Sequence, residues 1–197
     1  MEKKIFIIVL LLFSLTQKSF SYNSDPKKFI SEIVDEAKKI LVASNTKEFK
    51  TQKLSEIALE TVDINGVAYY AIGKHRKTLD DKQLDKYLLL FEDYFLKSFT
   101  SRLTDYSDPK INVVSADVIN EKYTIVKSVL MATDKRPEVK IEWRVYTKNP
   151  DKPLIRDLII EGISLARATK EEFMSIIDTN NGDVTKLFIS LKEFTSK

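Results

Sequence analysis

The apolar residues of this chain change their spacing near residue 111, and that change limits the folds open to it. Before this point apolar side chains recur every three or four residues, the period of a helix with one covered side. From residue 111 to about residue 165 they alternate with polar ones, as in strands with one covered face. After residue 169 the helical spacing returns. Helices on both sides of a run of strands predict an α+β domain.

Four strands joined by short turns are expected in the alternating region, as an antiparallel meander. They span residues 111–120, 122–133, 138–148 and 154–165. The third strand has the clearest alternation, and its apolar face carries Val139, Ile141, Trp143 and Val145. We therefore expect a four-stranded antiparallel sheet with helices packed on this apolar face and water on the other.

Six helical segments are expected around the sheet, at residues 26–41, 46–63, 67–72, 80–103, 169–179 and 183–194. Asp25 followed by Pro26 is typical of a helix start, and Asn65 with Gly66 is expected to end the second segment. The longest segment has an aromatic face made of Leu84, Tyr87, Leu88, Phe91, Phe95, Phe99 and Leu103. Such a face usually packs into a core, and it forms a ligand surface only exceptionally.

The first 21 residues predict a signal peptide. Lys3 and Lys4 precede an apolar run of 11 residues, and the segment ends in the small-x-small sequence Ser19-Phe20-Ser21. The run is shorter than the roughly 20 residues that cross a bilayer. We therefore expect cleavage after Ser21, a single domain over residues 22–197 and a periplasmic location; an uncleaved anchor is the alternative. The chain has no cysteine, which excludes disulfides, thiolate metal sites and lipidation of the new N-terminus.

The charge balance argues against nucleic acid as a partner. The chain has 32 basic and 29 acidic residues, of which the leader holds three lysines and one glutamate. Cleavage would leave 29 and 28, a net charge near +1. Binding to nucleic acid needs a basic face that neutralises several phosphates, and the sequence does not predict one.

Candidate catalytic residues are few, and none is assigned a catalytic role. The single histidine, His75, lies between Lys74 and Arg76 in an expected solvated turn, where the two positive neighbours make it a poor general base. Asp80 and Asp81 are better explained as a helix start. The sequence contains no nucleophile elbow, phosphate-binding glycine loop or metal-ligand cluster. No metal site and no cofactor are expected.

The last strand carries a charge and a glycine in its middle. Counted as one strand, it places Asp157 and Glu161 on one face, where we expect them to pair with Lys or Arg. Leu158, Ile160, Gly162 and Ser164 then share the other face. Gly162 in that position would leave a gap beside the third strand, which a ligand could fill. A β-bulge or a positive φ at Gly162 is the alternative.

Two blocks of the sequence resemble a known family. They are "VDINGVAYYAIGKHRKTLDDKQLDKYLLLFEDYFLKSFTSRL", residues 62–103, and "WRVYTKNPDKPLIRDLIIEGISLARATKEEF", residues 143–173. The second block contains the pattern Asp157, Glu161, Gly162 and Ser164. In their order and spacing, over about residues 26–194, the blocks are similar to MlaC, the toluene-tolerance family of periplasmic phospholipid-binding proteins.

The resemblance implies a lipid carrier and not an enzyme. It implies exchange of phospholipid between an outer-membrane lipoprotein complex and an inner-membrane ABC transporter with its lipid-binding ring protein, and so a role in outer-membrane lipid asymmetry. A phospholipid entering water loses roughly 0.8 kcal/mol per methylene, or on the order of 20 kcal/mol in all, so a carrier must supply an apolar cavity. The expected lipid-binding residues are Val67, Tyr70, Ala71, Leu88, Phe91, Phe95, Phe99, Val139, Ile141, Trp143, Val145, Leu158, Ile160, Gly162 and Ser164.

Three alternatives stay open. The ligand could be another apolar lipid, such as a hopanoid. The chain could be a small-molecule enzyme on a cone-shaped α+β fold, which would bury a polar group in its pocket. It could also be an interaction module of the cell envelope, which would have a filled core and an exposed apolar patch.

Overall fold

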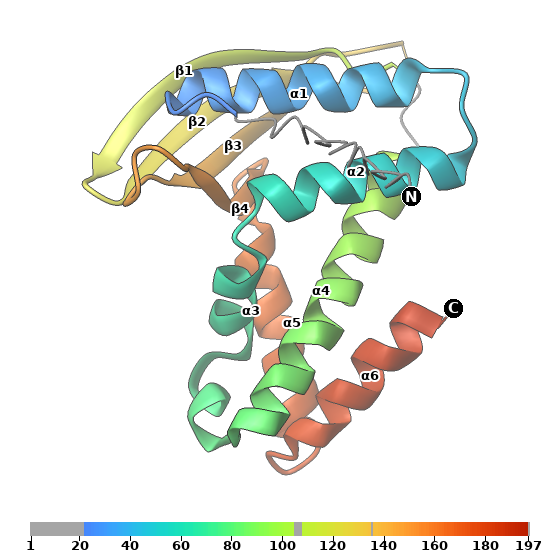
Figure 1. Ribbon diagram of the computed structural model, residues 1–197, viewed down its shortest axis with the longest axis vertical. Helices are drawn as coiled ribbons and strands as arrows, with labels where there is room; N and C mark the ends of the chain where they lie inside the picture. The colour runs from blue at the N-terminus through green and yellow to red at the C-terminus, as the bar shows by residue number, and fades with distance from the viewer. Residues whose placement is uncertain (1–21, 105–107, 135, 197) are drawn as a thin grey trace, which may run out of the picture.

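The computed structural model describes residues 22–104, 108–134 and 136–196, and the expected signal peptide lies outside the described residues. The α+β class and the antiparallel order of the strands are confirmed. Helices α1 to α4 precede the sheet, and α5 and α6 follow it (Figure 1). None of the helices in the described part of the chain combines the length and the apolar composition needed to cross a membrane.

The sheet has five strands in the order of the sequence, not four. They are β1 (Ile111–Asn120), β2 (Tyr123–Leu130), β3 (Val139–Tyr146), β4 (Leu154–Ile160) and β5 (Ile163–Ser164). The extra strand arises because the last expected strand ends at Ile160 and folds back on itself. The register places Trp143 opposite both Val126 and Leu158, which confirms the predicted facing of the third strand.

Helix α1 (Pro26–Val42) covers the apolar face of the sheet. It begins as predicted: Pro26 is its first residue, and the Asp25 side chain accepts a hydrogen bond from the backbone N–H of Lys28 at 2.9 Å. Its buried side chains pack against three strands and one residue of α2. This sheet core consists of Phe29, Ile30, Ile33, Val34, Ile57, Val126, Val145 and Ile155.

Helices α2 (Lys47–Thr61) and α3 (Ile64–Ile72) meet at a sharp junction. The Asp63 side chain caps α3 by accepting a hydrogen bond from the backbone N–H of Gly66 at 2.9 Å. The expectation that Asn65 and Gly66 separate the two helices is wrong, because both residues lie in the first turn of α3. A capping aspartate two residues earlier starts the new helix despite the glycine.

The remaining helices lie beside the sheet, and all of them except a short 3-10 helix contribute to a second core. They are the 3-10 helix η1 (Gly73–Thr78), α4 (Asp81–Leu103), α5 (Leu165–Thr179) and α6 (Val184–Ser196). Asp80 and Gln83 form a reciprocal capping box at the start of α4, which confirms the predicted helix start. The helical core, which α3 also joins, includes Ile64, Val67, Ala68, Ala71, Ile72, Tyr87, Phe91, Ala166, Phe173, Ile177, Val184, Leu187, Phe188 and Leu191.

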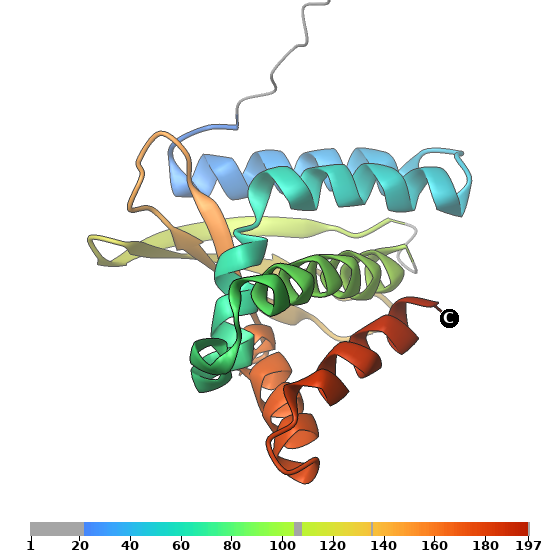
Figure 2. The same ribbon diagram turned by 60° about the horizontal axis from the view of Figure 1, so that its bottom comes forward.

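The protein therefore consists of a sheet lobe and a helical lobe with separate cores. The sheet lobe contains β1–β5, α1 and α2, and the helical lobe contains α3–α6 and extends away from the sheet (Figures 1 and 2). Among the partly buried residues packed against the two cores, Val62 belongs to both. Next to it, the backbone N–H of Asp63 donates to the carbonyl of Ile155 at 2.9 Å, and Val62 forms a parallel bridge with Ile155. This joint at Val62 and Asp63 is one of the connections between the two lobes.

Candidate functional site

The aromatic face of α4 is fully buried in its middle and only half-buried towards its C-terminal end. Tyr87 and Phe91 are fully buried in the helical core, where the Phe91 ring packs edge-on against Phe173. Phe95 and Phe99 continue the same stripe but are only half-buried. Their rings are stacked, with centroids 5.9 Å apart and an angle of 7° between the ring planes. The second half of the stripe thus leaves apolar surface that the protein itself does not cover.

The apolar face of the sheet has a similar half-buried region beyond α1. The register pairs Trp143 with Leu158 and Ile141 with Ile160, so these side chains share one face, as the sequence predicts. Ile141 is buried, whereas Trp143, Leu158 and Ile160 are half-buried. The indole N–H of Trp143 donates to the Ser128 hydroxyl at 2.8 Å. Because that polar group is satisfied within the sheet, the indole ring can serve as apolar surface.

These two half-buried regions form the candidate site, which we call the interlobe surface: Phe95 and Phe99 from α4, and Trp143, Leu158 and Ile160 from the sheet. In both overall views α4 runs between the sheet and α6 (Figures 1 and 2). The arrangement offers apolar contact without a buried charge, which suits an apolar ligand.

Apart from Ile141, Gly162 and Ser164, the other residues expected to bind lipid fall into three groups. Val67, Ala71, Phe91 and Val145 are buried among protein side chains of the two cores. Leu88 and Val139 are half-buried, and Leu88 packs against the helical core. Tyr70 is 46% exposed on the outside of α3. Direct contact with lipid stays a prediction for each of them.

The expectation that Glu161 and Gly162 lie in the middle of the last strand is wrong. They form the two-residue turn between β4 and β5, with φ of +80° at Gly162 and +49° at Glu161. Positive φ at both residues is the pattern of a type I′ hairpin turn, which glycine accommodates at little cost. Gly162 is exposed, and nothing lies within 4 Å of the place where a Cβ would be. The alternative of a positive φ is therefore confirmed, and the glycine leaves no gap in a strand.

Asp157 has a structural role that Glu161 does not share. Its carboxylate lies 3.6 Å from the Arg144 guanidinium, as predicted, and accepts hydrogen bonds from the Ser164 hydroxyl at 2.6 Å and the Ala166 backbone N–H at 3.0 Å. Ser164 is the N-cap of α5, so this network ties the start of α5 to β4. The expected shared face with Glu161 is wrong, because the turn directs Glu161 to the backbone N–H of Lys140.

The titratable residues that the sequence singles out do not converge on a reaction centre. His75 lies in η1, and its Nε2 atom is shielded from solvent without a hydrogen-bond partner, which corrects the expectation of a solvated side chain. Burial raises the pKa of the Tyr87 hydroxyl, which donates to the Ala68 carbonyl at 2.8 Å. Within residues 22–104, 108–134 and 136–196, no three His, Asp or Glu side chains are placed to hold a metal ion.

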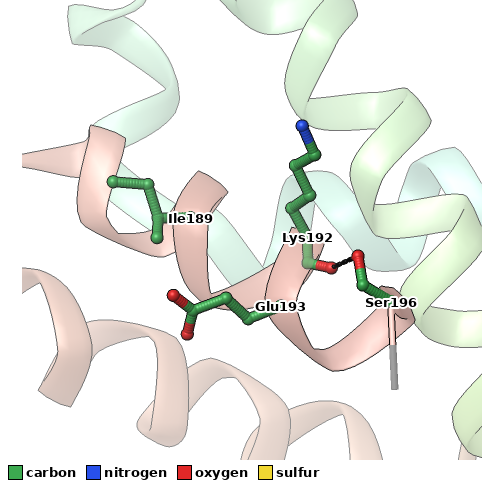
Figure 3. Close-up of a pocket in the computed structure, with 4 residues that line it drawn as sticks. All are labelled: Ile189, Lys192, Glu193 and Ser196. Carbon is green, nitrogen blue, oxygen red and sulfur yellow. Dashed lines mark hydrogen bonds between the residues drawn. The ribbon is translucent and has the colours of Figure 1, made fainter.

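A surface hollow of about 480 Å³ lies along α6 and was not predicted from the sequence. Four residues on one side of that helix line it: Ile189, Lys192, Glu193 and Ser196 (Figure 3). Figure 3 shows the Lys192 and Glu193 side chains pointing in different directions, so they do not form one polar centre. Ile189 is an apolar residue that the structure leaves 50% exposed. A single exposed apolar residue is weak evidence for a site, so the sequence offers little reason to expect this hollow.

Comparisons with known proteins identify a similar fold and a family. The fold is similar to that of a phospholipid-binding protein from Ralstonia solanacearum whose structure was solved in complex with a phospholipid. The two chains are 16% identical, with a TM-score of 0.72, and the match covers 85% of this chain and 94% of that one. No curated protein matches this chain significantly. A family model described as "MlaC protein" matches residues 28–193, and since that match spans most of the sequence, the chain belongs to the MlaC family.

Proposed function

We propose that the protein is a periplasmic phospholipid-binding carrier and not an enzyme. This proposal rests on membership of the MlaC family. The fold adds support, since the similar structure from Ralstonia solanacearum was solved with a phospholipid bound. In this proposal residues 1–21 are removed on export and residues 22–197 act as one lipid-binding domain.

The acyl chains are proposed to occupy the interlobe surface. Transfer of a phospholipid through water costs roughly 0.8 kcal/mol for each exposed methylene, so a carrier must replace that loss with apolar contact. The half-buried rings of Phe95 and Phe99 offer such contact on α4, and Trp143 and Leu158 offer it on the sheet. Separate cores in the two lobes support this placement, because a ligand between them would not disrupt either core.

The proposed partners are those of a shuttle between two membranes. The carrier would collect or deliver lipid at an outer-membrane lipoprotein complex and at an inner-membrane ABC transporter with its lipid-binding ring protein, and so maintain outer-membrane lipid asymmetry. The half-buried apolar side chains of α4 and of the sheet support carriage, because they can offer an acyl chain apolar contact.

Native mass spectrometry of protein purified from the periplasm tests the proposal. We expect one diacyl phospholipid per chain, and a hopanoid or another lipid would appear as a different ligand mass. The double variant Phe95→Gln and Phe99→Gln is expected to carry much less lipid, because polar amides would replace the apolar rings. Leu89→Gln is the matched control, since Leu89 lies on the same helix but is 68% exposed. Wild-type protein without extractable lipid, or equal lipid in the double variant and the control, would contradict the proposal.

A further inference from the structure

A cluster of cations, which we call the basic tip, lies at the end of the helical lobe farthest from the sheet. It comprises Lys74, Arg76 and Lys77 of η1, together with Lys170 of α5. Lys74 and Lys77 are three residues apart in a 3-10 helix, so they project from the same side. Lys170 joins them because its Nζ atom would lie 3.9 Å from a Cβ placed on Gly73. Figure 1 shows η1 as the green turn between α3 and α4 at the bottom of the molecule.

Two tyrosines of α3 lie within the basic tip. The Arg76 guanidinium lies 5.1 Å from the centre of the Tyr69 ring, and the Lys170 ammonium lies 4.9 Å from the centre of the Tyr70 ring. Tyr70 remains 46% exposed despite this contact. The tip therefore combines positive charge with aromatic rings, the composition found where proteins meet the interface of a bilayer.

The cations of the basic tip lack acidic partners. Among the described residues, no carboxylate lies within 4.0 Å of the charged groups of Lys74, Arg76, Lys77 or Lys170. By contrast, Arg144 and Arg156 in the sheet both pair with aspartates. Along the chain, Glu171 and Glu172 follow Lys170 in α5, and Asp80 and Asp81 follow the cations of η1 at the start of α4, where the helix dipole offsets their charge. The tip thus presents cations whose charged groups are not held in ion pairs by the described residues.

We infer that the basic tip docks the protein reversibly on an anionic phospholipid bilayer. The tip is a single six-residue turn with its neighbours, which is too small for the roughly 800 Å² per partner of a stable protein interface. Contacts with a bilayer need no such area, because each cation near an anionic membrane adds attraction on its own. An acidic protein surface is the competing partner. The inference does not depend on where lipid binds within the carrier.

Co-sedimentation with lipid vesicles tests this inference. The protein is expected to bind vesicles made of equal parts phosphatidylcholine and phosphatidylglycerol, and not vesicles of phosphatidylcholine alone. The triple variant Lys74→Gln, Arg76→Gln and Lys77→Gln is expected to lose about 100-fold in partition coefficient, at about 1 kcal/mol for each cation. The matched control, Lys27→Gln, Lys28→Gln and Lys39→Gln, removes three exposed lysines of α1 and is expected to bind like wild type.

Salt gives a second readout. Raising the ionic strength from about 0.01 M to about 1 M shortens the Debye length from about 30 to about 3 Å, so bound protein should leave the vesicles. Absence of vesicle binding, equal binding to both vesicle types, or equal losses in the two triple variants would each overturn the inference. Absence of vesicle binding would favour an acidic protein surface as the partner of the basic tip. Bound lipid is measured on the same preparations, so a failure of lipid carriage is distinguished from a failure of docking.

Discussion

Arg156 connects the two lobes, and its replacement by methionine is expected to destabilise the protein. Its guanidinium contacts the Asp63 carboxylate at 2.6 and 2.7 Å and donates to the Tyr123 hydroxyl at 2.9 Å. It also stacks on the Tyr146 ring, 3.6 Å from the centroid. A bulge in β4 places Arg156 where it can make these contacts. Arg144 pairs with Asp157 and Val145 with Ile155, so Arg156 is the extra residue of the bulge.

The expected loss lies between those of an exposed and a buried ion pair. The Arg156 and Asp63 side chains are 29% and 20% exposed. Exposed pairs contribute about 0.2–1 kcal/mol, whereas breaking a buried pair costs about 3–5 kcal/mol. For this partly buried pair we expect Arg156→Met to lower the free energy of unfolding by about 2 kcal/mol, since a charged hydrogen bond contributes about 1.5–3 kcal/mol.

A double-mutant cycle isolates the ion pair from the other contacts. Asp63→Asn keeps an oxygen that can cap α3 at Gly66, so it removes the charge but not the cap. We expect the two single changes and their combination, measured by urea unfolding with circular dichroism, to give a coupling energy of about 1 kcal/mol. A coupling energy below about 0.3 kcal/mol would refute the reasoning, because the residues would then act independently. Asp63→Ala is the informative comparison, since it loses the cap as well and should destabilise more.

Three further predictions concern single positions. Gly162→Leu is expected to lower the free energy of unfolding by more than about 1 kcal/mol, because its φ is +80°, while bound lipid stays unchanged; a stable variant that loses lipid would contradict this. Ser128→Ala leaves the half-buried indole N–H of Trp143 without its acceptor and should cost about 1 kcal/mol, followed by the fluorescence of this single tryptophan. Ser128→Thr keeps the hydroxyl and should cost less; equal losses in the two variants would refute the role of that bond. Intact mass of the exported protein should correspond to a chain that begins at Tyr22, and a mass that includes residues 1–21 would exclude the predicted cleavage.

Much of the fold follows from local sequence signals. Asp25 with Pro26 and Asp80 start helices where predicted, because capping involves residues only three or four apart. The alternation around Trp143 likewise predicts which side chains share a face of the sheet. These features depend on backbone periods that the sequence displays directly.

The turn at Glu161 and Gly162 shows where a local signal was ambiguous. The two-residue turn pairs Ile160 with Ile163 and Ile159 with Ser164, so the alternation changes phase across it, and a count that continues through the turn places Ile163 and Ser164 on the wrong faces. A polar residue followed by glycine is itself a hairpin signal, and it could have indicated the turn. The hydrogen bonding between Ile160 and Ile163 decides between the two readings, and periodicity does not report it.

The division of the aromatic stripe on α4 is a property of the tertiary structure. Phe91 and Phe99 occupy the same face of the helix, yet one is buried by α5 and the other remains half-buried. Arg156 and Asp63 are 93 residues apart, and only the bulge in β4 and the junction of α2 and α3 bring them together. Helical period and residue type determine which side chains are apolar and which way they point. How far each is covered depends on segments distant in the sequence, because burial is set by the packing of whole helices and strands against one another.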